Sequence, residues 1–550
     1  MNFCYKNQMR KEIKPLILLV GIFLIFSIFF FAKCANPIID FSREAYIPYK
    51  MLSGSVLIKD IFLIYGSFGY ILNSLIFKIF GANFNLLFLE ANLISFLFLI
   101  TFYFISRNYL NIKEAVLFSF CFVSVNIFST ATFSFATPYS FSTLWGYLGA
   151  YLSYLCFLKS KSALGFFFLG FVLINKIELG AILLFSIFIF QLLKKNFSIK
   201  NALYALIFPI LDSFYFVLNK VTFFDFSNNL FYLKKMVNTN AIKTFYFHVG
   251  VYFNKEYYIF NLKMLLFLIL ALFVSYLLFK KGFKAFSIFS FFFFCALFFV
   301  SKATNLAILF LLYPLVFLIF KKKKLKEKDI LLLIFTILLN LKAIFCINTF
   351  NYSNFGFILV FFAIYAFHKK ILPFPFRKWL FGVSFVVILF LNFFNIQNFI
   401  MQNKIPENNK KGTLYLSKND GNKLLFEFLN KSLKKEDTFL VVPEGLIFNF
   451  IFEKPYPYYY STFTPLDFET FSESRIIKDV SKYEPNYIIF YPRNTREYGA
   501  ETICYDYAIN FCTYIMENYS RVGIIEDEKK ILIFRRKKKS EFCNLAVPKT

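Results

Sequence analysis

The sequence up to residue 399 consists largely of long apolar runs separated by short polar loops. Each run is about 15–22 residues long, and at about 1.5 Å of helix rise per residue such a run crosses the hydrocarbon of a bilayer. We therefore predict a polytopic α-helical membrane protein with about 13 transmembrane helices. The predicted spans are residues 15–35, 84–106, 114–133, 140–158, 163–175, 178–193, 202–218, 262–279, 285–300, 303–320, 329–347, 354–367 and 379–396.

The basic residues predict how these spans are oriented. With a cytoplasmic N-terminus, each even-numbered span ends at a loop rich in Lys and Arg, as expected for loops retained in the cytoplasm. The connections after residues 133, 300 and 347 are instead short and nearly uncharged. The first run is too long for a signal-peptide core and lacks a clean small-residue cleavage site, so we interpret it as an uncleaved span. An odd number of spans then places the C-terminus outside the cytoplasm.

The composition agrees with a membrane protein and excludes a nucleic-acid binder. Hydrophobic residues make up 58% of the chain, and 88 residues are Phe, whereas soluble domains contain about 45–50% apolar residues. The formal net charge is +29, but Lys and Arg lie mostly in the loops between apolar runs rather than on one basic module. We attribute the charge to membrane topology and predict contact with membrane lipids and no nucleic-acid partner.

Two connections on the predicted outer side are long, residues 36–83 and residues 219–261. Long connections in compact proteins usually carry function. Each contains an amphipathic stretch, residues 70–80 and 245–260, that we expect in the membrane interface. The two loops are therefore the first places to search for a site.

The chain changes character from residue 400 to residue 550, where polar and charged residues dominate. Strand-like runs and helical patterns alternate there, which predicts an extracytoplasmic α/β domain. The strand-like runs are residues 438–442, 487–491 and 530–534, and the helical patterns are residues 421–433 and 471–483. The domain contains no GxGxxG motif and no P-loop motif, so we expect no nucleotide site in it. Glu444 follows one of the strands, and the aromatic residues 456–460 are candidates for acceptor recognition if they are exposed.

The cysteines carry little chemistry in this interpretation. Residues 503–519 have a helical pattern, and eight residues along one helix separate Cys504 from Cys512 by about 12 Å. That distance is too long for a disulfide, so we predict free thiols. The chain has no CxxC pair and only two histidines, so we predict no His/Cys metal site.

The loop of residues 36–83 carries the candidate chemistry. Asp40, Arg43 and Glu44 share one face of a helix at spacings of three and four residues. Asp60 and its neighbour Lys59 arrive on a separate segment, after a turn permitted by Gly54. Acids and cations that converge at the membrane surface suit sugar transfer from a lipid phosphate, because a carboxylate takes the acceptor proton and cations stabilise the departing phosphate. The alternative is that these charges only cap and position interfacial helices.

This loop resembles the first outer loop of the GT-C superfamily of membrane glycosyltransferases, which includes mannosyltransferase-like and aminoarabinose-transferase-like proteins. Members often carry an Asp after the first span, then a Gly, and then an Asp before a Tyr-Gly-Pro stretch. The matching positions here are Asp40, Gly54, Asp60, Tyr65 and Gly66, with Ser67 where Pro is common. The span count and the outer α/β domain are also similar. A second match is the Lys-containing run of residues 175–180, while the WWDYG-type motif of oligosaccharyltransferases is absent.

The resemblance implies a polyprenyl-phosphate-linked sugar donor, a glycan, lipid or protein acceptor, and roles for particular residues. Asp40 would be the catalytic base, and Asp60 would assist it or bind the acceptor. Lys176 would contact the donor phosphate. The further candidates for substrate or phosphate binding are Arg43, Glu44, Lys59, Tyr65 and Glu178. The structural alternative for Lys176 and Glu178 is an ion pair at a helix end. No cofactor is certain, but paired acids leave a divalent cation possible.

Other functions are weighed against this one. A transporter or flippase for lipid-linked glycans should have paired half-repeats and charges buried at mid-membrane, and we find no convincing repeat. A polymerase or ligase of lipid-linked glycans usually relies on a large outer loop in the later half of the chain. Glu90 and Asp212 lie within or near predicted spans and are candidates because of that position alone.

Overall fold

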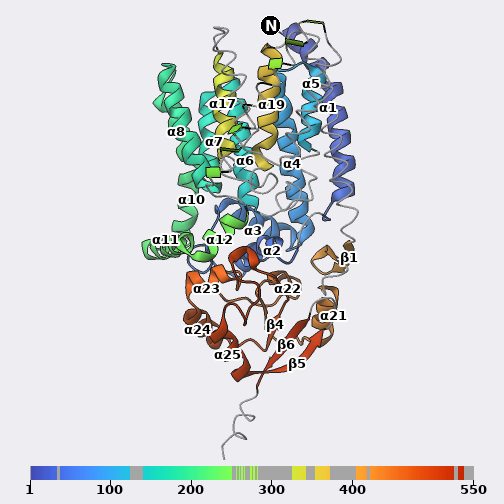
Figure 1. The fold of residues 1–550 in the computed structure, drawn as a ribbon, viewed down its shortest axis with the longest axis vertical. Helices are drawn as coiled ribbons and strands as arrows, with labels where there is room; N and C mark the ends of the chain where they lie inside the picture. The colour runs from blue at the N-terminus through green and yellow to red at the C-terminus, as the bar shows by residue number, and fades with distance from the viewer. Residues whose placement is uncertain are drawn as a thin grey trace, which may run out of the picture.

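The computed structural model describes residues 2–33, 37–123, 140–249, 325–341, 354–371, 404–417, 422–525 and 530–537, together with scattered residues between 255 and 282. The described chain has two parts, a bundle of long helices and a C-terminal domain that lies at one end of the bundle (Figure 1). The bundle contains the apolar part of the sequence, and the C-terminal domain contains the polar part.

The bundle contains helices at most of the predicted spans. They are α1 (Asn2–Phe30), α4 (Phe84–Arg107), α5 (Ile112–Phe122), α6 (Phe141–Leu158), α7 (Ser162–Asn175), α8 (Ile177–Leu193), α9 (Ile199–Ala202), η2 (Leu203–Leu206), α10 (Ile207–Leu218), α17 (Glu327–Leu339) and α19 (Asn354–Ile371). Within the described residues, Glu12–Phe30, Phe84–Arg107 and Ile199–Leu218 are long and apolar enough to cross a membrane. The spans predicted at 285–300, 303–320 and 379–396 lie outside the described residues, so the count of thirteen stays a prediction.

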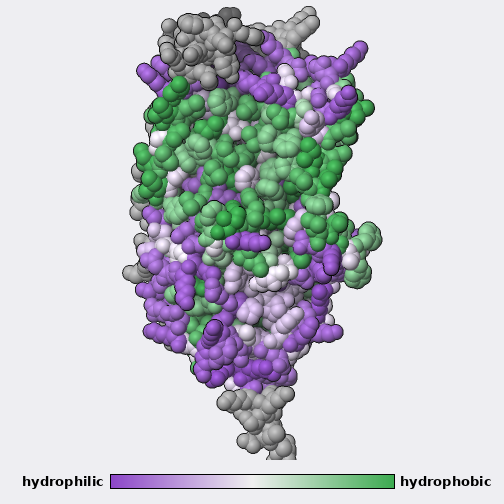
Figure 2. Space-filling model, turned by 180° about the vertical axis from the view of Figure 1, so that it is seen from behind, coloured by the Kyte–Doolittle hydropathy of each residue, from purple (hydrophilic) through white to green (hydrophobic). Residues whose placement is uncertain are grey.

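The surface of the bundle is apolar where a bilayer would cover it. Figure 2 shows a broad band of hydrophobic residues across one face of the helical part, with hydrophilic residues above and below it. Large side chains such as Ile25, Phe185 and Val217 are 66–70% exposed in this bundle. Water would penalise such exposure, whereas lipid tails do not, so the helical part is a membrane domain.

Both long loops contain helices that lie between the bundle and the C-terminal domain (Figure 1). The first loop contributes α2 (Asp40–Leu52) and α3 (Phe68–Phe80), and the second contributes α11 (Phe223–Asn238) and α12 (Asn240–His248). A capping box between Thr222 and Asp225 begins α11. Phe223 and Phe224 are exposed on this helix, as expected for a helix in the membrane interface.

The two spans predicted within residues 163–193 correspond to the helices α7 and α8. Lys176 alone separates them, with an extended φ of −149° and ψ of 84°. A Cβ atom at Gly180 would lie 2.6 Å from the backbone of Leu173. Glycine at position 180 therefore lets α8 pack closely against α7. Lys176 forms the turn between the two helices, which is the α7–α8 corner.

The C-terminal domain is built on a four-stranded sheet in the order β3-β4-β6-β5. Its strands are β3 (Phe439–Val442), β4 (Tyr487–Phe490), β5 (Tyr519–Ile525) and β6 (Ile531–Arg536). β3 and β4 are parallel, and β6 pairs antiparallel with both β4 and β5. The helices are α21 (Asn422–Ser432), α22 (Leu446–Ile451), α23 (Pro465–Phe471), α24 (Glu473–Tyr483), η3 (Arg496–Tyr498) and α25 (Ile509–Asn518), and a hairpin of β1 (Lys404–Asn409) and β2 (Gly412–Ser417) precedes them.

The predicted strands at 438–442, 487–491 and 530–534 and both predicted helices are confirmed within one to three residues at most ends. β5 and the β1–β2 hairpin were not predicted. β5 exposes most of its side chains, since it lies at the edge of the sheet. It therefore lacks the run of apolar residues that reveals a buried strand.

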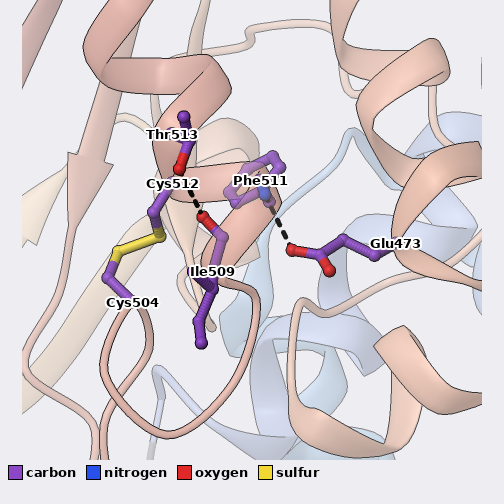
Figure 3. Close-up of a disulfide and its surroundings, with 6 residues drawn as sticks. All are labelled: Glu473, Cys504, Ile509, Phe511, Cys512 and Thr513. Carbon is purple, nitrogen blue, oxygen red and sulfur yellow. Dashed lines mark hydrogen bonds between the residues drawn. A yellow bond between two sulfur atoms is a disulfide. The ribbon is translucent and has the colours of Figure 1, made fainter.

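The prediction of free thiols at Cys504 and Cys512 is wrong. The two residues form a disulfide with their Cα atoms 5.5 Å apart (Figure 3). Helix α25 begins only at Ile509, because Cys504 and Ala508 have positive φ values of 75° and 59° and the chain between them makes a turn. Glu473 accepts a hydrogen bond from the backbone N–H of Phe511, at 2.7 Å, at the start of that helix. The helical pattern was correct for residues 509–518 alone.

The C-terminal domain rests directly on the first loop. The backbone N–H of Phe62 donates to the carbonyl of Tyr459 at 2.8 Å, and the Lys50 ammonium donates to the carbonyl of Tyr458 at 2.8 Å. Tyr49 packs edge-on against Phe450 of α22, with ring centroids 5.5 Å apart. These contacts join the segment that carries the candidate chemistry to both parts of the protein.

Candidate functional site

The helix predicted for Asp40, Arg43 and Glu44 is α2, which begins at Asp40. Its buried side chains, Phe41 and Ala45 among them, face the core, so the first turn is fixed against the bundle. The helix N-terminus favours a negative charge at Asp40 through its dipole. The side chain of Asp40 lies outside the described residues, so its predicted role as a base stays a prediction.

Glu44 is a buried carboxylate that connects three helices. It accepts hydrogen bonds from the Tyr70 hydroxyl of α3 at 3.1 Å and from the backbone N–H of Phe141, at the start of α6, at 3.2 Å. Burial raises the pKa of Glu44 to about 7, and the nearby charge of Arg43 opposes the shift. Glu44 therefore holds the first loop against the bundle, and its charge depends on pH near neutrality.

Arg43 and Tyr65 lie together although 22 positions separate them in the sequence. The Arg43 guanidinium lies over the Tyr65 ring, 5.0 Å from its centroid, and its Nε is 3.7 Å from Glu44 Oε1. A cation on an aromatic face is attracted by the ring quadrupole. Three of the predicted site residues thus form one contact cluster.

Gly66 brings the two sequence motifs together. A Cβ atom at Gly66 would lie 2.2 Å from the carbonyl oxygen of Ile174 and 2.5 Å from Cα of Asn175. The carbonyl of Gly66 also accepts a hydrogen bond from the Ser142 hydroxyl at 2.5 Å. The first loop is therefore packed against the corner that precedes Lys176, and only glycine permits this approach.

Lys176 and Glu178 form an ion pair at this corner, with 3.1 Å between Nζ and Oε1. The side chain of Lys176 is 15% exposed and that of Glu178 is 47% exposed. The structural alternative considered for these residues is thus present in the protein. The ammonium of Lys176 has further N–H donors beside the one directed at Glu178, and such donors bind phosphate oxygens well.

Asp60 faces its own loop. Its Oδ2 accepts the backbone N–H of Val56 at 2.8 Å, and its carbonyl accepts from the Lys50 ammonium at 3.4 Å. Burial lowers the pKa of Lys50 to about 8, and the charge of Asp60 opposes the shift. Lys59 is exposed, and its charge adds to the hydrogen bonds from Thr222 that lower the pKa of Asp225 on α11. The described contacts give Asp60 a role in shaping the loop, and its catalytic part stays a prediction.

Two acids considered because of their position have specific partners. Glu90 accepts a hydrogen bond from the Trp145 indole at 2.8 Å, and Asp212 accepts one from the Ser67 hydroxyl. Ser67, which stands where the resemblance leads to an expectation of Pro, thus joins the first loop to α10.

Sequence reasoning missed two contributions from outside the first loop. Asn229 of α11 accepts the backbone N–H of Leu63 at 3.0 Å and donates to its carbonyl at 3.1 Å, so its amide pairs with the loop as a strand would. Arg493 of the C-terminal domain donates to Glu444 at 2.8 Å. Only the position of Glu444 after a predicted strand gave a signal for the second.

The aromatic residues 456–460 do not form an exposed recognition surface. Tyr456, Tyr458 and Tyr460 are 1–5% exposed and pack on one another and on Phe463. Tyr456 also packs against Tyr46 of α2, with centroids 5.9 Å apart. The exposure that acceptor recognition would require is therefore absent at these three tyrosines, because they fill the boundary between the two parts of the protein.

No described group of three or more His, Cys, Asp or Glu side chains is arranged to hold a metal ion. The residues described at the site are a buried carboxylate, an arginine on an aromatic ring and a lysine corner. The guanidinium of Arg43 and the ammonium of Lys176 can recognise negatively charged oxygens, because both groups are hydrogen-bond donors.

No family model and no curated protein sequence matches this chain. Among solved structures, the chain is similar to ArnT from Cupriavidus metallidurans bound to undecaprenyl phosphate, with a TM-score of 0.55 and 10% sequence identity over 97% of this chain and 99% of that chain. It also matches the oligosaccharyltransferase AglB from Archaeoglobus fulgidus in complex with an inhibitory peptide and a dolichol-phosphate, over 82% of this chain and 65% of that chain at 12% identity, but the TM-score of 0.40 is too low to show a common fold. The similarity to ArnT covers both parts of the protein, so the chain shares the overall fold of ArnT.

Proposed function

We propose that this protein is a membrane glycosyltransferase that moves a hexosyl or pentosyl unit from a polyprenyl-phosphate donor to a glycan, lipid or protein acceptor. The observation that carries the proposal is the contact of Gly66 with the α7–α8 corner. This contact places the acidic first loop next to the segment that carries Lys176. The chain also has the fold of ArnT over nearly its whole length. The proposal agrees with the groups at the site, which are suited to bind a lipid phosphate.

In this reaction Asp40 acts as the general base. The acceptor hydroxyl oxygen attacks the anomeric carbon of the donor sugar, and Asp40 takes the hydroxyl proton. The bond between that carbon and the phosphate oxygen breaks, and the polyprenyl phosphate leaves with the electron pair. Arg43 and Lys176 stabilise the negative charge that grows on the phosphate. A single displacement of this kind inverts the anomeric configuration.

The remaining site residues position these groups. Glu44 and Tyr65 hold the Arg43 side chain, since both contact it. Glu178 orients Lys176 through its ion pair. Asp60 keeps residues 56–60 in their turn, with Lys59 on the exposed side where it can meet the acceptor. A divalent cation has no part in the steps above.

We place the site on the outer face of an inner membrane, with a cytoplasmic N-terminus and a periplasmic C-terminal domain. The distribution of basic loops supports this orientation. The disulfide between Cys504 and Cys512 supports it as well, because such bonds persist in oxidising compartments. Labelling of exposed residues in intact cells with a reagent that does not cross the membrane tests the orientation.

The proposal is tested by comparing glycan masses from cells with the intact gene, a deletion, and Asp40→Asn at matched membrane levels of the protein. Glu501→Gln serves as the control, because Glu501 is exposed and pairs only with Arg496 among its described side-chain contacts. A glycan that lacks one sugar in the deletion and in Asp40→Asn, but not in the control, supports the function and the base. If the deletion leaves every glycan unchanged, the proposed function is wrong. If only Asp40→Asn leaves them unchanged, the assigned base is wrong.

A further inference from the structure

Helix α11 of the second long loop has one face packed on the protein and one apolar face that is exposed. The exposed face carries large side chains that are 58–89% exposed, namely Phe223, Phe224, Leu230, Phe231 and Val237. The first, third and fifth of these recur every seven residues, as do the other two, so together they form one stripe along the helix. We call these residues the apolar stripe. A contiguous apolar surface of this kind marks a contact with a partner or with a membrane.

The apolar stripe continues the lipid-facing surface of the membrane domain. Helix α10 precedes α11, and its last turn exposes Val217 and Leu218 by 70% and 63%. Figure 1 shows α11 running across the end of the bundle, at the level where the C-terminal domain begins. In the reversed view of Figure 2, hydrophobic residues project at this level on the matching side. The stripe therefore lies at the border of the apolar band, where lipid headgroups meet acyl chains.

Two exposed lysines accompany the stripe, Lys220 before α11 and Lys234 within it. Lys234 follows Leu230 by one helical turn, so both lie on the same side of the helix. A lysine beside apolar residues directs its ammonium to lipid phosphates while its stem stays among the acyl chains. Lipid phosphates complement this charge, whereas a second copy of the chain would bring another lysine to it across a twofold axis. The charge therefore favours lipid as the occupant of this face.

The opposite face of α11 holds the first loop. Phe226 packs against an apolar cluster that includes Leu57 and Ile61 of that loop. Asn229 is 5% exposed, and its amide accepts the backbone N–H of Leu63 at 3.0 Å and donates to the carbonyl of Leu63 at 3.1 Å. An amide that bonds both backbone groups of one residue fixes the direction as well as the distance of that segment. Helix α11 and residues 57–63 are therefore joined as one unit.

The C-terminal domain contacts the same face of α11. The Tyr459 hydroxyl lies 3.1 Å from Oδ1 of Asn229. The Arg475 guanidinium lies over the ring of Tyr232 on α11, 4.8 Å from its centroid, and Phe471 packs on that ring with centroids 4.8 Å apart. A cation on an aromatic face is attracted by the ring quadrupole. The inner face of α11 is thus held by the first loop and by the C-terminal domain together.

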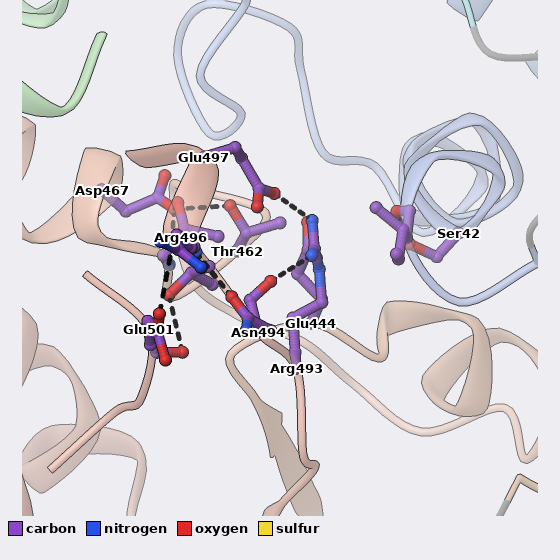
Figure 4. A network of polar contacts seen from close by, with 12 residues as sticks. Ser42, Glu444, Thr462, Asp467, Arg493, Asn494, Arg496, Glu497 and Glu501 are labelled. Atoms are coloured by element: carbon purple, nitrogen blue, oxygen red, sulfur yellow. Dashed lines mark hydrogen bonds and ion pairs between the residues drawn. The ribbon is translucent and has the colours of Figure 1, made fainter. Parts of the chain in front are cut away.

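The part of the C-terminal domain that receives Tyr232 is well defined. Phe471 ends α23, and a capping box between Thr464 and Asp467 begins that helix. Asp467 also accepts a hydrogen bond from the Thr462 hydroxyl (Figure 4). Because the start of α23 is fixed, the position of α11 against the protein is fixed as well.

We propose that α11 is a membrane anchor of the first loop: the apolar stripe enters the phospholipid leaflet next to the C-terminal domain, and the opposite face of the helix holds residues 57–63 at the depth of the lipid headgroups. The partner is the bilayer itself, with acyl chains on the stripe and phosphates on the lysines. This inference does not depend on sugar transfer and goes beyond the proposed function. A polar stripe would draw α11 out of the leaflet, and the hydrogen bonds of Asn229 with Leu63 would open more often.

The first test measures the depth of the stripe by quenching of tryptophan fluorescence. Full-length Phe224→Trp is reconstituted in vesicles of phosphatidylethanolamine and phosphatidylglycerol whose acyl chains carry bromine close to the glycerol. The signal of the unmodified protein, which has two Trp residues, is subtracted. We expect bromine to quench the added fluorescence by about half, since a helix at this boundary buries its apolar face about 5–10 Å deep. Tyr505→Trp is the matched control and stays unquenched, because Tyr505 is 82% exposed on the C-terminal domain.

The second test measures the link to the first loop by hydrogen–deuterium exchange in lipid nanodiscs. In the double variant Phe223→Ser with Phe224→Ser, we expect the backbone N–H groups of Phe62 and Leu63 to exchange about tenfold faster, because local opening sets the exchange rate. Phe185→Ser is the control, since Phe185 is 66% exposed on α8 and the variant makes the same change on another lipid-facing helix. It should leave exchange at these two positions unchanged.

The outcomes decide the inference without any measurement of sugar transfer. If bromine does not quench the fluorescence of Phe224→Trp, the stripe lies outside the lipid and the proposal is overturned; cross-linking of two chains through α11 would then identify a second copy as the occupant. If quenching occurs but exchange at residues 57–63 stays unchanged in the double variant, the anchoring role is overturned. Should the double variant not fold, Asn229→Ala tests the same link, since it leaves the stripe intact and should speed exchange without changing the quenching. A failure of the glycan test leaves this inference standing.

Discussion

Substitution of Gly66 by Ala tests the contact that unites the two halves of the site. The added Cβ atom would lie 2.2 Å from the carbonyl oxygen of Ile174 and 2.6 Å from that of Asn175. Both neighbours are backbone atoms, so no side chain can rotate away to make room. Ordinary contacts need about 3.5 Å, and the loop must therefore move away from the corner by about 1 Å.

The expected cost follows from that displacement. Overpacking of a well-filled contact destabilises a protein by about 1–3 kcal/mol. A shift of about 1 Å in a catalytic arrangement lowers the rate by about 100-fold. We therefore expect Gly66→Ala to lose most of its activity while the thermal midpoint falls by only a few degrees, because the displaced segment is short compared with the bundle.

The assay compares glycan masses from cells, together with the thermal midpoint and undecaprenyl phosphate affinity of the purified protein. Gly21→Ala is the matched control, since a Cβ atom at Gly21 of α1 meets nothing within 4 Å and Ala favours a helix. The reasoning is refuted if Gly66→Ala retains normal glycans and normal affinity. It is also refuted if Gly66→Ala and Gly21→Ala behave alike.

Three further predictions concern stability. The pKa of Glu44 is raised from 4.5 to about 7, so the folded state holds its proton more tightly than the unfolded state, and stability from this group is lost as pH rises from about 4.5 to about 7. Glu44→Gln should therefore increase the free energy of unfolding at pH 8 by at most about 3 kcal/mol, which is measured as a higher thermal midpoint. At pH 5 the midpoint should change little. An equal effect at pH 8 and pH 5 would contradict the assignment. Replacing both Cys504 and Cys512 by Ser opens a loop with a sequence separation of 8 and should cost about 2.5 kcal/mol, measured as a lower midpoint that reductant no longer changes. Asn229→Ala removes the amide that pairs with both backbone groups of Leu63 and should cost about 2–3 kcal/mol, whereas Asn238→Ala on the exposed side of the same helix should cost little; similar losses for both would show that the loop contact is unimportant.

The sequence by itself determined the elements of this protein. Apolar runs that are long enough to cross a bilayer are helical wherever the structure describes them, because hydrocarbon forces the backbone to satisfy its hydrogen bonds within the segment. The segment that carries Arg43 and Glu44 is helical as predicted, since both lie on α2. The alternation of buried strands with helices was also visible, since buried strands such as β3 are continuous apolar runs.

Local sequence patterns were misleading in two segments of the C-terminal domain. The helical pattern of residues 503–519 conceals a turn that brings Cys504 within 5.5 Å of Cys512 at the Cα atoms. The run of Tyr456 to Tyr460 has the composition of a recognition surface, but it is buried because the C-terminal domain packs on the first loop. Neither outcome depends on the residues of the segment alone.

Only the tertiary structure decided which distant groups meet. Gly66 lies on the α7–α8 corner, Asn229 pairs with Leu63, and the backbone N–H of Phe62 donates to the carbonyl of Tyr459. These contacts join positions that are about 100 to 400 residues apart, and no periodicity in the sequence records such a separation. They arise from helix packing. A glycine at a close contact and a buried charge with its partner each permit only one arrangement of the neighbouring segments. Sequence patterns predict the secondary structure of a segment, whereas tertiary packing determines which other residues the segment contacts.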